Sequence, residues 1–213
     1  PGEAVELLDG CGRVGEGRLV TASGAGRRAE AVVEIDRVRT LAPLTPELVL
    51  LQALPKATAM DWLIEKATEL GVAAIQPVLT ERTVNRLSGE REEKQLERWR
   101  RIALAAAKQC GTPWLPAIRP IRPLAGALAG HGAERLVVGA LVGTPPPLRE
   151  VIGMLGAVPR SVAILIGPEG DLSPAELDAA VAAGALPANF GPLVLRVETA
   201  ALFALSALVA AYR

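Results

Sequence analysis

Aromatic residues, histidine and cysteine are scarce in this sequence of 213 residues. Phe, Trp and Tyr make up 3% of it although half of the residues are hydrophobic, so the core must be aliphatic, which suits a layered α/β architecture. The single histidine, His131, stands in a glycine-rich stretch that predicts a surface loop. With one histidine, the chain has few of the residues that a zinc site or a Ser-His-Asp triad needs. Cys11 and Cys110 form neither a metal-ligand pattern nor a disulfide framework, which favours a reducing, cytoplasmic environment.

The sequence also lacks a typical membrane segment. It opens on Pro1 without a charged and then apolar leader. Its longest apolar stretch, residues 200–212, contains Ser206 and is shorter than the about 20 residues that a membrane span requires. We therefore expect no membrane contact, and this stretch is predicted to be a buried or subunit-facing helix.

Acidic and basic residues balance, with 23 of each. A nucleic-acid-binding protein usually has a positive footprint, so this balance argues mildly against such a partner. The distribution is uneven, however, because residues 98–122 contain no acid and six cations: Arg98, Arg100, Arg101, Lys108, Arg119 and Arg122. On charge alone, a solvated helix face is the simpler interpretation, and a phosphate-binding surface is the alternative.

The first 43 residues differ from the rest in pattern. Short β-type runs at residues 4–10, 17–23 and 29–38 alternate with glycine-rich turns and predict a small β module. Residues 10–15 match the dinucleotide fingerprint GxGxxG, but a β-type segment follows them where that motif requires a helix. We interpret this match as a hairpin turn. Residues 40–46, with two prolines, are predicted to be a linker.

From residue 47 onward the pattern alternates between strands and helices. Such alternation predicts a mostly parallel sheet with helices on both faces. Helices are expected at residues 56–71, where Gly71 supplies the stop, and at residues 90–110, which Gly111 follows. Strands are expected at residues 47–54, 72–79, 135–142, 161–167 and 186–191.

The first segment that suggests chemistry begins where the predicted strand at residues 161–167 ends, in the sequence Gly167-Pro168-Glu169-Gly170. The helix that follows has a complete start signal, because Ser173 can be its N-cap, Pro174 fits its first turn and Glu176 occupies the capping-box position. A plain turn does not require the preceding glycines. In open α/β sheets ligands bind at the carboxyl ends of strands, and glycine lets the backbone approach them closely.

The second such segment is residues 189–200. A Gly-Pro pair again follows a predicted strand, and Arg196-Val197-Glu198-Thr199 opens the last helix, with Thr199 as the predicted N-cap. An ion pair between Arg196 and Glu198 is the simpler structural interpretation. Each segment alone is weak evidence for a ligand site, but the two together predict a site built from two glycine-rich loops.

The two segments, IGPEGDLSPAE and FGPLVLRVETAAL, resemble the paired C-terminal motifs of the RsmE family, the 16S ribosomal RNA uridine-N3 methyltransferases of the SPOUT class. Further agreement covers nearly all of the chain after residue 45. It lies at residues 56–58 with Met60, 65–71, 80–84, 98–99 and 106–111 with Pro116.

The resemblance implies an α/β fold of the SPOUT type, with a mostly parallel sheet and a trefoil knot, over residues 44–213. A small PUA-like β-barrel domain that binds RNA, with its front residues missing, would occupy residues 1–43. It also implies a cytoplasmic homodimer whose active site lies at the subunit interface, S-adenosyl-L-methionine as cofactor and the 16S ribosomal RNA of the small ribosomal subunit as partner.

The resemblance further implies roles for individual residues, and no metal. The residues expected to bind the cofactor are Gly139, Leu165, Ile166, Gly167, Pro168, Glu169, Gly170, Phe190, Gly191, Leu193, Leu195 and Thr199. The loop at Gly139 and Ala140 would form one wall of that site. The residues expected to contact RNA are Arg82, Arg98, Arg101 and Lys108.

Uracil N3 carries a proton that must leave before or during methyl transfer, so a cation or a general base would help. Arg196 and Glu198 are the only charged residues of the second segment, and they are the catalytic candidates. Arg196 would stabilise negative charge on O2 or O4, and Glu198 would orient Arg196 or accept the proton.

The sequence departs from the family pattern where it has Leu193 instead of arginine, Val197 instead of threonine, and Thr112 or Pro113 instead of arginine. Two other functions therefore stay open. One is a SPOUT-type methyltransferase that acts on tRNA or on another ribosomal RNA nucleotide. The other is a non-catalytic RNA-binding assembly factor with this fold.

Overall fold

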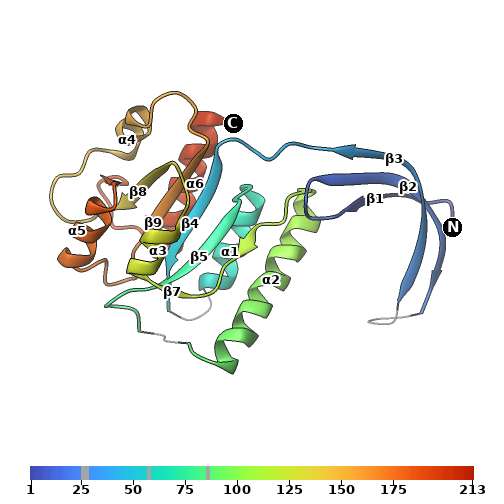
Figure 1. The fold of residues 1–213 in the computed structure, drawn as a ribbon, viewed down its shortest axis with the longest axis horizontal. Helices are drawn as coiled ribbons and strands as arrows, with labels where there is room; N and C mark the ends of the chain where they lie inside the picture. Colours follow the sequence, from blue (N-terminus) through green and yellow to red (C-terminus); the bar gives the residue numbers. More distant parts are fainter. Residues whose placement is uncertain (25–28, 57–58, 85–86) are drawn as a thin grey trace.

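The computed structural model describes residues 1–24, 29–56, 59–84 and 87–213. Ala57 and Thr58, which contribute to the family resemblance, lie outside these ranges. Within them, a small antiparallel sheet at one end of the molecule is joined to a larger parallel sheet that is covered by helices (Figure 1). The prediction of an α/β fold with a mostly parallel sheet is confirmed.

The small sheet is an antiparallel meander of β1 (Ala4–Leu8), β2 (Arg13–Ser23) and β3 (Glu30–Thr40). In the turn between β1 and β2, the carboxylate of Asp9 accepts hydrogen bonds from the backbone N–H groups of Cys11 and Arg13, at 2.7 and 3.0 Å. These bonds lower the pKa of Asp9. Gly12 has a φ of 93°, which favours glycine. The motif at residues 10–15 therefore belongs to a hairpin turn, as predicted.

Trp114 connects this turn to the larger sheet. Its indole N–H donates a hydrogen bond to the carbonyl oxygen of Ala42 at 3.2 Å. Its ring lies so close to Gly12 that a Cβ atom there would collide with it, and the Gly12 N–H donates to the carbonyl oxygen of Pro113 at 2.9 Å. Glycine at position 12 is thus required by the packing of Trp114 as well as by the backbone angle.

The larger sheet has the strand order β10-β8-β9-β4-β5-β6, with β7 also paired to β5, and all of these pairings are parallel. The carboxyl ends of neighbouring strands therefore lie at one edge. The predicted strands are all present, with boundaries shifted by a few residues. The strands are β4 (Glu47–Ala53), β5 (Ala74–Leu79), β6 (Ala117–Ile118), β7 (Arg122–Pro123), β8 (Arg135–Gly139), β9 (Ser161–Ile166) and β10 (Ala185–Ala188).

Both faces of the larger sheet are apolar, and helices cover each of them. Successive side chains of a strand point to opposite faces, so Leu48 and Leu50 of β4 join one buried cluster and Val49 and Leu51 join the other. The first cluster also receives side chains from α1, α2, α4 and α6, and the second from α3 and α5. The helices are α1 (Ala59–Glu69), α2 (Glu90–Cys110), α3 (Leu124–Gly130), α4 (Leu148–Met154), α5 (Pro174–Ala182) and α6 (Val197–Tyr212).

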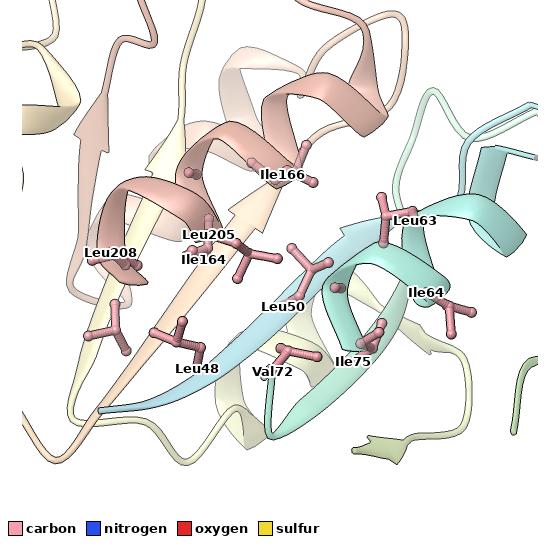
Figure 2. Close-up of a cluster of buried hydrophobic side chains, with 14 of the residues drawn as sticks. Leu48, Leu50, Leu63, Ile64, Val72, Ile75, Ile164, Ile166, Leu205 and Leu208 are labelled. Atoms are coloured by element: carbon pink, nitrogen blue, oxygen red, sulfur yellow. The ribbon is translucent and has the colours of Figure 1, made fainter. Parts of the chain in front are cut away.

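Figure 2 shows how α6 is held on the sheet, with Leu205 and Leu208 lying over Leu48 and Ile164 of the central strands. All four side chains are at most 1% exposed. The apolar stretch at residues 200–212 is therefore a helix that packs against the sheet, as predicted. No helix among the described residues is long and apolar enough to cross a bilayer.

One predicted helix start is confirmed and one is wrong. Ser173 is the N-cap of α5, with both reciprocal bonds of a capping box to Glu176. In α6, however, the N-cap is Arg196, with φ −63° and ψ 153°, so Thr199 lies inside the first turn. The helix begins early because Val197, 6% exposed, packs into the core on the same face as Ala201, and this packing overrides the local capping preference.

We predict that Ser173→Ala lowers the free energy of unfolding by about 1 kcal/mol, because it removes the acceptor for the Glu176 N–H, which now lies 3.3 Å from the Ser173 hydroxyl. Urea denaturation measures this change. Ser206→Ala is the matched control, since Ser206 is an exposed serine inside a helix. Equal free energies of unfolding in the two variants would contradict a contribution from the capping box.

Candidate functional site

The strand order places three loops next to one another. β10, β8 and β9 are neighbours, and their carboxyl ends lead into residues 189–196, 140–147 and 167–173. These loops surround a cavity of about 150 Å³. It is lined by Gly139, Ala140, Leu141, Gly143, Pro145, Ile166, Gly167, Pro168, Asp171, Ala188, Asn189, Phe190, Gly191, Leu193, Leu195, Val197 and Ala200.

Backbone forms much of the wall, because glycines stand where the loops approach each other. A Cβ atom on Gly139 would lie 2.9 Å from the ring of Phe190, and one on Gly167 would lie 3.1 Å from the backbone nitrogen of Leu172. Gly191 has a φ of 117° and open space beside it. Glycine at positions 139 and 167 is therefore required by the close packing of one part of the chain on another, and the close approach to a ligand stays a prediction.

The loop after β10 is fixed by polar contacts at its base. The side-chain oxygen of Asn189 accepts a hydrogen bond from the Gly191 N–H at 2.7 Å, which shapes the turn locally. The backbone carbonyl of Asn189 accepts from the Leu148 N–H at 2.9 Å, so the loops after β8 and β10 are tied together. Phe190 packs against Phe203 of α6, with ring centroids 5.9 Å apart.

Asp171 supplies the only charge among the side chains that line the cavity. Its carboxylate accepts a hydrogen bond from the Leu172 N–H at 2.8 Å, and its own N–H donates to the carbonyl oxygen of Pro168 at 2.9 Å. Apart from Asp171 and the amide of Asn189, the lining side chains are apolar or absent, as at the glycines. Such a site suits a flat apolar group together with a positively charged one.

The structure brings most of the predicted cofactor-binding residues together. Eight line the cavity: Gly139, Ile166, Gly167, Pro168, Phe190, Gly191, Leu193 and Leu195. Four do not. Leu165 is fully buried on the opposite face of the sheet, Thr199 is exposed on α6, and Glu169 and Gly170 bond to neighbouring loops instead.

The catalytic candidates flank the wall without forming it. Arg196 is exposed and Glu198 is half-buried, and Val197 between them lines the cavity. No ion pair joins Arg196 to Glu198 in the part of the chain that the structure describes. Their expected mutual pairing is therefore absent here.

The residues predicted to contact RNA are all exposed, but they differ in their partners. Arg98 forms an ion pair with Asp61, whose other oxygen accepts from the indole N–H of the neighbouring Trp99 at 3.1 Å. Arg101 lies 3.9 Å from Glu97 of the same helix. Lys108 lies in the last turn of α2. The fourth, Arg82, donates to the carbonyl oxygen of Gly170 next to the cavity.

Several wall residues were not predicted from the sequence: Leu141, Gly143, Pro145, Asp171 and Asn189. Residues 143–147, Gly-Thr-Pro-Pro-Pro, repeat the pattern of glycine and proline after a strand, so this third loop carried a usable signal. Asp171 carried none, because its place at the cavity depends on the three-dimensional turn of residues 167–172.

Comparison with known proteins agrees with this geometry. The RNA methyltransferase domain family matches residues 42–209. Ribosomal RNA small subunit methyltransferase E of Mycobacterium bovis is 34% identical over 211 residues, which cover 97% of this chain and 78% of the relative. The chain belongs to the RsmE family of RNA methyltransferases.

A solved RsmE-family structure has the same fold. Ribosomal RNA small subunit methyltransferase E from Neisseria gonorrhoeae, crystallised with S-adenosyl methionine, is 32% identical and has a TM-score of 0.83, covering 98% of this chain and 83% of that one. The SpoU methyltransferase AviRb from Streptomyces viridochromogenes, 16% identical, covers 84% of this chain and 66% of its own with a TM-score of 0.50. This last likeness concerns the fold alone.

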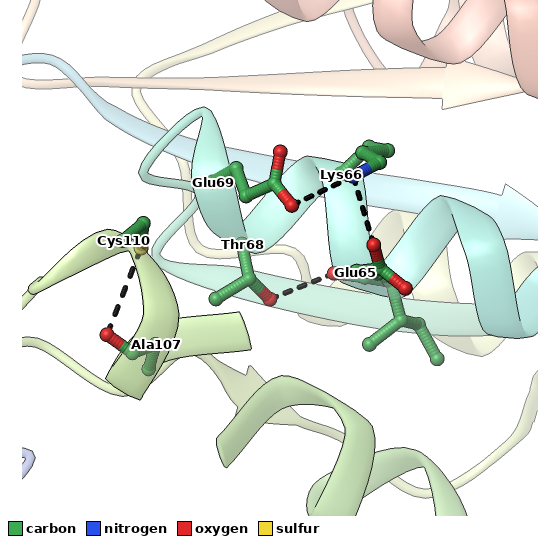
Figure 3. A network of polar contacts seen from close by, with 7 residues as sticks. Glu65, Lys66, Thr68, Glu69, Ala107 and Cys110 are labelled. Atoms are coloured by element: carbon green, nitrogen blue, oxygen red, sulfur yellow. Dashed lines mark hydrogen bonds and ion pairs between the residues drawn. The ribbon is translucent and has the colours of Figure 1, made fainter. Parts of the chain in front are cut away.

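Polar clusters elsewhere are satisfied within the scaffold. On α1, the ammonium of Lys66 lies 2.8 Å from carboxylate oxygens of both Glu65 and Glu69 (Figure 3), and these contacts raise its pKa. The hydroxyl of Thr68 donates to the carbonyl oxygen of Ile64 at 2.7 Å. Among the residues that the structure describes, no group of His, Cys, Asp and Glu could hold a metal ion.

His131 lies away from the cavity, between α3 and the amino end of β8, and it is half-buried. Its Nδ1 accepts a hydrogen bond from the Ala133 N–H at 3.0 Å. Burial, and secondarily the charge of Arg119, lower its pKa. The predicted loop position is confirmed, but the side chain is less exposed than a surface residue.

We predict that His131, the only histidine, titrates in the folded protein below the ordinary value of about 6.5. The unfolded chain then binds the proton more readily, so the free energy of unfolding falls as the pH drops from about 6.5 through the folded pKa. The single imidazole signal in a proton NMR titration measures this pKa directly. A midpoint at or above 6.5 would contradict the prediction.

Proposed function

We propose that this chain transfers a methyl group from S-adenosylmethionine to N3 of a uridine in the 16S ribosomal RNA of the small ribosomal subunit. The observation that carries the proposal is the backbone-lined cavity at the carboxyl ends of β8, β9 and β10. Membership of the RsmE family, and the cofactor crystallised with its gonococcal relative, support it.

The residues present fit the cofactor. Phe190, Leu193 and Leu195 offer apolar surface to its adenine and ribose, and backbone at Gly139 and Gly167 offers hydrogen-bonding groups without side-chain obstruction. The carboxylate of Asp171 offers a partner for positive charge. When bound, the cofactor supplies a methyl group already activated by its sulfonium. The protein's main task is then to hold the uracil close and in line.

Arg196 and Glu198 are proposed to handle the N3 proton and the charge that its loss leaves. Both lie at the start of α6, on either side of Val197. Glu198, in the first turn of α6, is proposed to orient Arg196 or to accept the proton. Arg196, with its exposed guanidinium, would stabilise negative charge on O2 or O4 of the uracil.

We further propose that residues 44–213 carry the SPOUT trefoil knot and that two subunits pack around the cavity. The non-sequential strand order, with β9 between β8 and β4, is compatible with such threading. A homodimer is supported by exposed apolar side chains on the cavity loops and on α6. These are Leu141, Val142, Leu193, Val194 and Phe203, between 45% and 79% exposed.

Residues 1–43 are proposed to be a PUA-like RNA-binding domain, and the three antiparallel strands β1–β3 support this. The proposed cationic contacts with RNA are Arg98, Arg101 and Lys108 on α2, whereas Arg82, also expected from the sequence, lies in the loop after β5 and contacts Gly170. A cytoplasmic location follows from the substrate, since ribosomal subunits are found there.

We predict that purified small ribosomal subunits from a strain lacking this gene gain one N3-methyluridine when incubated with the protein and S-adenosylmethionine. Mass-spectrometric mapping of the 16S RNA identifies the nucleotide. Arg196→Ala should lower kcat by about 100-fold, as loss of a charge-stabilising donor does, with cofactor binding retained. Methylation of a different nucleotide would support another SPOUT-type enzyme, and absence of turnover would support an assembly factor.

We predict that Gly191→Ala weakens the binding of S-adenosylmethionine while Gly156→Ala does not. Both glycines have positive φ, 117° and 87°, and both have open space beside the backbone, so alanine strains each backbone by about 1–3 kcal/mol without a collision. Of these two glycines, Gly191 lines the cavity and Gly156 does not. Calorimetric titration measures the affinities. Unchanged affinity in Gly191→Ala would contradict the assignment of this loop, and absence of binding by the unsubstituted protein would overturn the proposed function.

A further inference from the structure

The loop at residues 167–172 holds a strained backbone. Asp171 has a φ of 62°, and it is the only residue other than glycine with positive φ in the part of the chain that the structure describes. Aspartate tolerates this region better than most residues, but the conformation still costs free energy. Strain of this kind persists where the surroundings determine the conformation. The contacts that hold this loop therefore matter for the cavity that Asp171 lines.

Those contacts come from the loops that follow β4, which is next to β9 in the sheet, and β5, which is one strand further away. After β4, the backbone N–H of Lys56 donates to the carboxylate of Glu169 at 2.7 Å. After β5, the guanidinium of Arg82 donates to the carbonyl oxygen of Gly170, the residue directly before Asp171. The backbone N–H of Glu81 also donates to the carboxylate of Glu176 at 2.7 Å, in the first turn of α5.

The loop at residues 80–84 is itself well fixed. The hydroxyls of Thr80 and Thr83 lie 2.8 Å apart, and the Thr80 N–H donates to the Thr83 hydroxyl at 3.0 Å. Both threonines are buried, at 3% and 5% exposed. Arg82 therefore extends from a turn closed by hydrogen bonds between two buried threonines, and from there it contacts Gly170 of the 167–172 loop.

We propose that Arg82 is a positioning residue for cofactor binding. Through the carbonyl oxygen of Gly170 it holds Asp171 in its strained conformation, and so keeps the carboxylate and the backbone of Gly167 in place as a wall of the cavity. The proposal rests on the proposed function for the identity of the ligand. It differs from the expectation for Arg82 drawn from the sequence, which was contact with RNA.

Hydrogen exchange of the protein without cofactor tests the restraint itself. In Arg82→Ala the amides of residues 170–172 should exchange about tenfold faster than in the unsubstituted protein, as expected when a charged hydrogen bond is lost. Arg82→Lys, which keeps one donor, should restore part of the protection. Arg160→Ala is the matched control, because that exposed arginine lies at the opposite edge of the sheet. Unchanged exchange in Arg82→Ala would overturn the proposal.

Calorimetry and kinetics then test the consequence. Arg82→Ala should raise the Kd and the KM for S-adenosylmethionine about tenfold and leave kcat at saturating cofactor near its original value, with partial rescue by lysine. Thr83→Val, which removes a hydroxyl from the supporting turn, should act in the same direction. A raised KM for RNA alone, with cofactor affinity unchanged, would show that Arg82 acts on RNA and would also overturn the proposal. If the unsubstituted protein binds no S-adenosylmethionine, the proposed function fails, and the exchange measurement still decides the role of Arg82.

Discussion

Parallel pairing of β10, β8, β9 and β4 is the constraint on which the rest of this structure depends. A parallel sheet needs apolar cover on both faces, and the alternation of Leu48, Val49, Leu50 and Leu51 supplies side chains to both. The same pairing sets every carboxyl end at one edge. Three loops remote in the sequence meet there because their strands are neighbours in the sheet, and the cavity is a consequence of that register.

The sequence predicted the scaffold well because its signals are local. Strand runs such as residues 161–167, the helix ending at Gly111 and the capping box at Ser173 each specify one element through its own residues. The start of α6 was predicted three residues late, because Thr199 was expected as the N-cap and Arg196 occupies that position. The burial of Val197 in the core determines where this helix begins, and the capping preferences of nearby residues contain no information about such a tertiary contact.

The candidate site was predictable only in part, for the same reason. Glycine and proline after a strand identify the cavity loops, and eight of the twelve expected cofactor residues line the cavity. The pattern could not separate Ile166, which lines it, from Leu165, which faces the other core. Nor could it reveal that Asp171 lines the cavity or that Arg82 reaches Gly170, because these depend on how the loops after β5 and β9 meet.

The wall of backbone around the cavity has a consequence for divergence within the family. The position of peptide groups in such a wall depends on the length and the turn geometry of each loop. The wall therefore tolerates exchange of side chains, but not insertion or deletion of residues. The leucine at position 193 and the valine at position 197 can therefore differ from the family pattern while the loop keeps its path. Exchange of a side chain at position 193 or 197 then alters the apolar surface of the cavity while the backbone part of its wall stays in place.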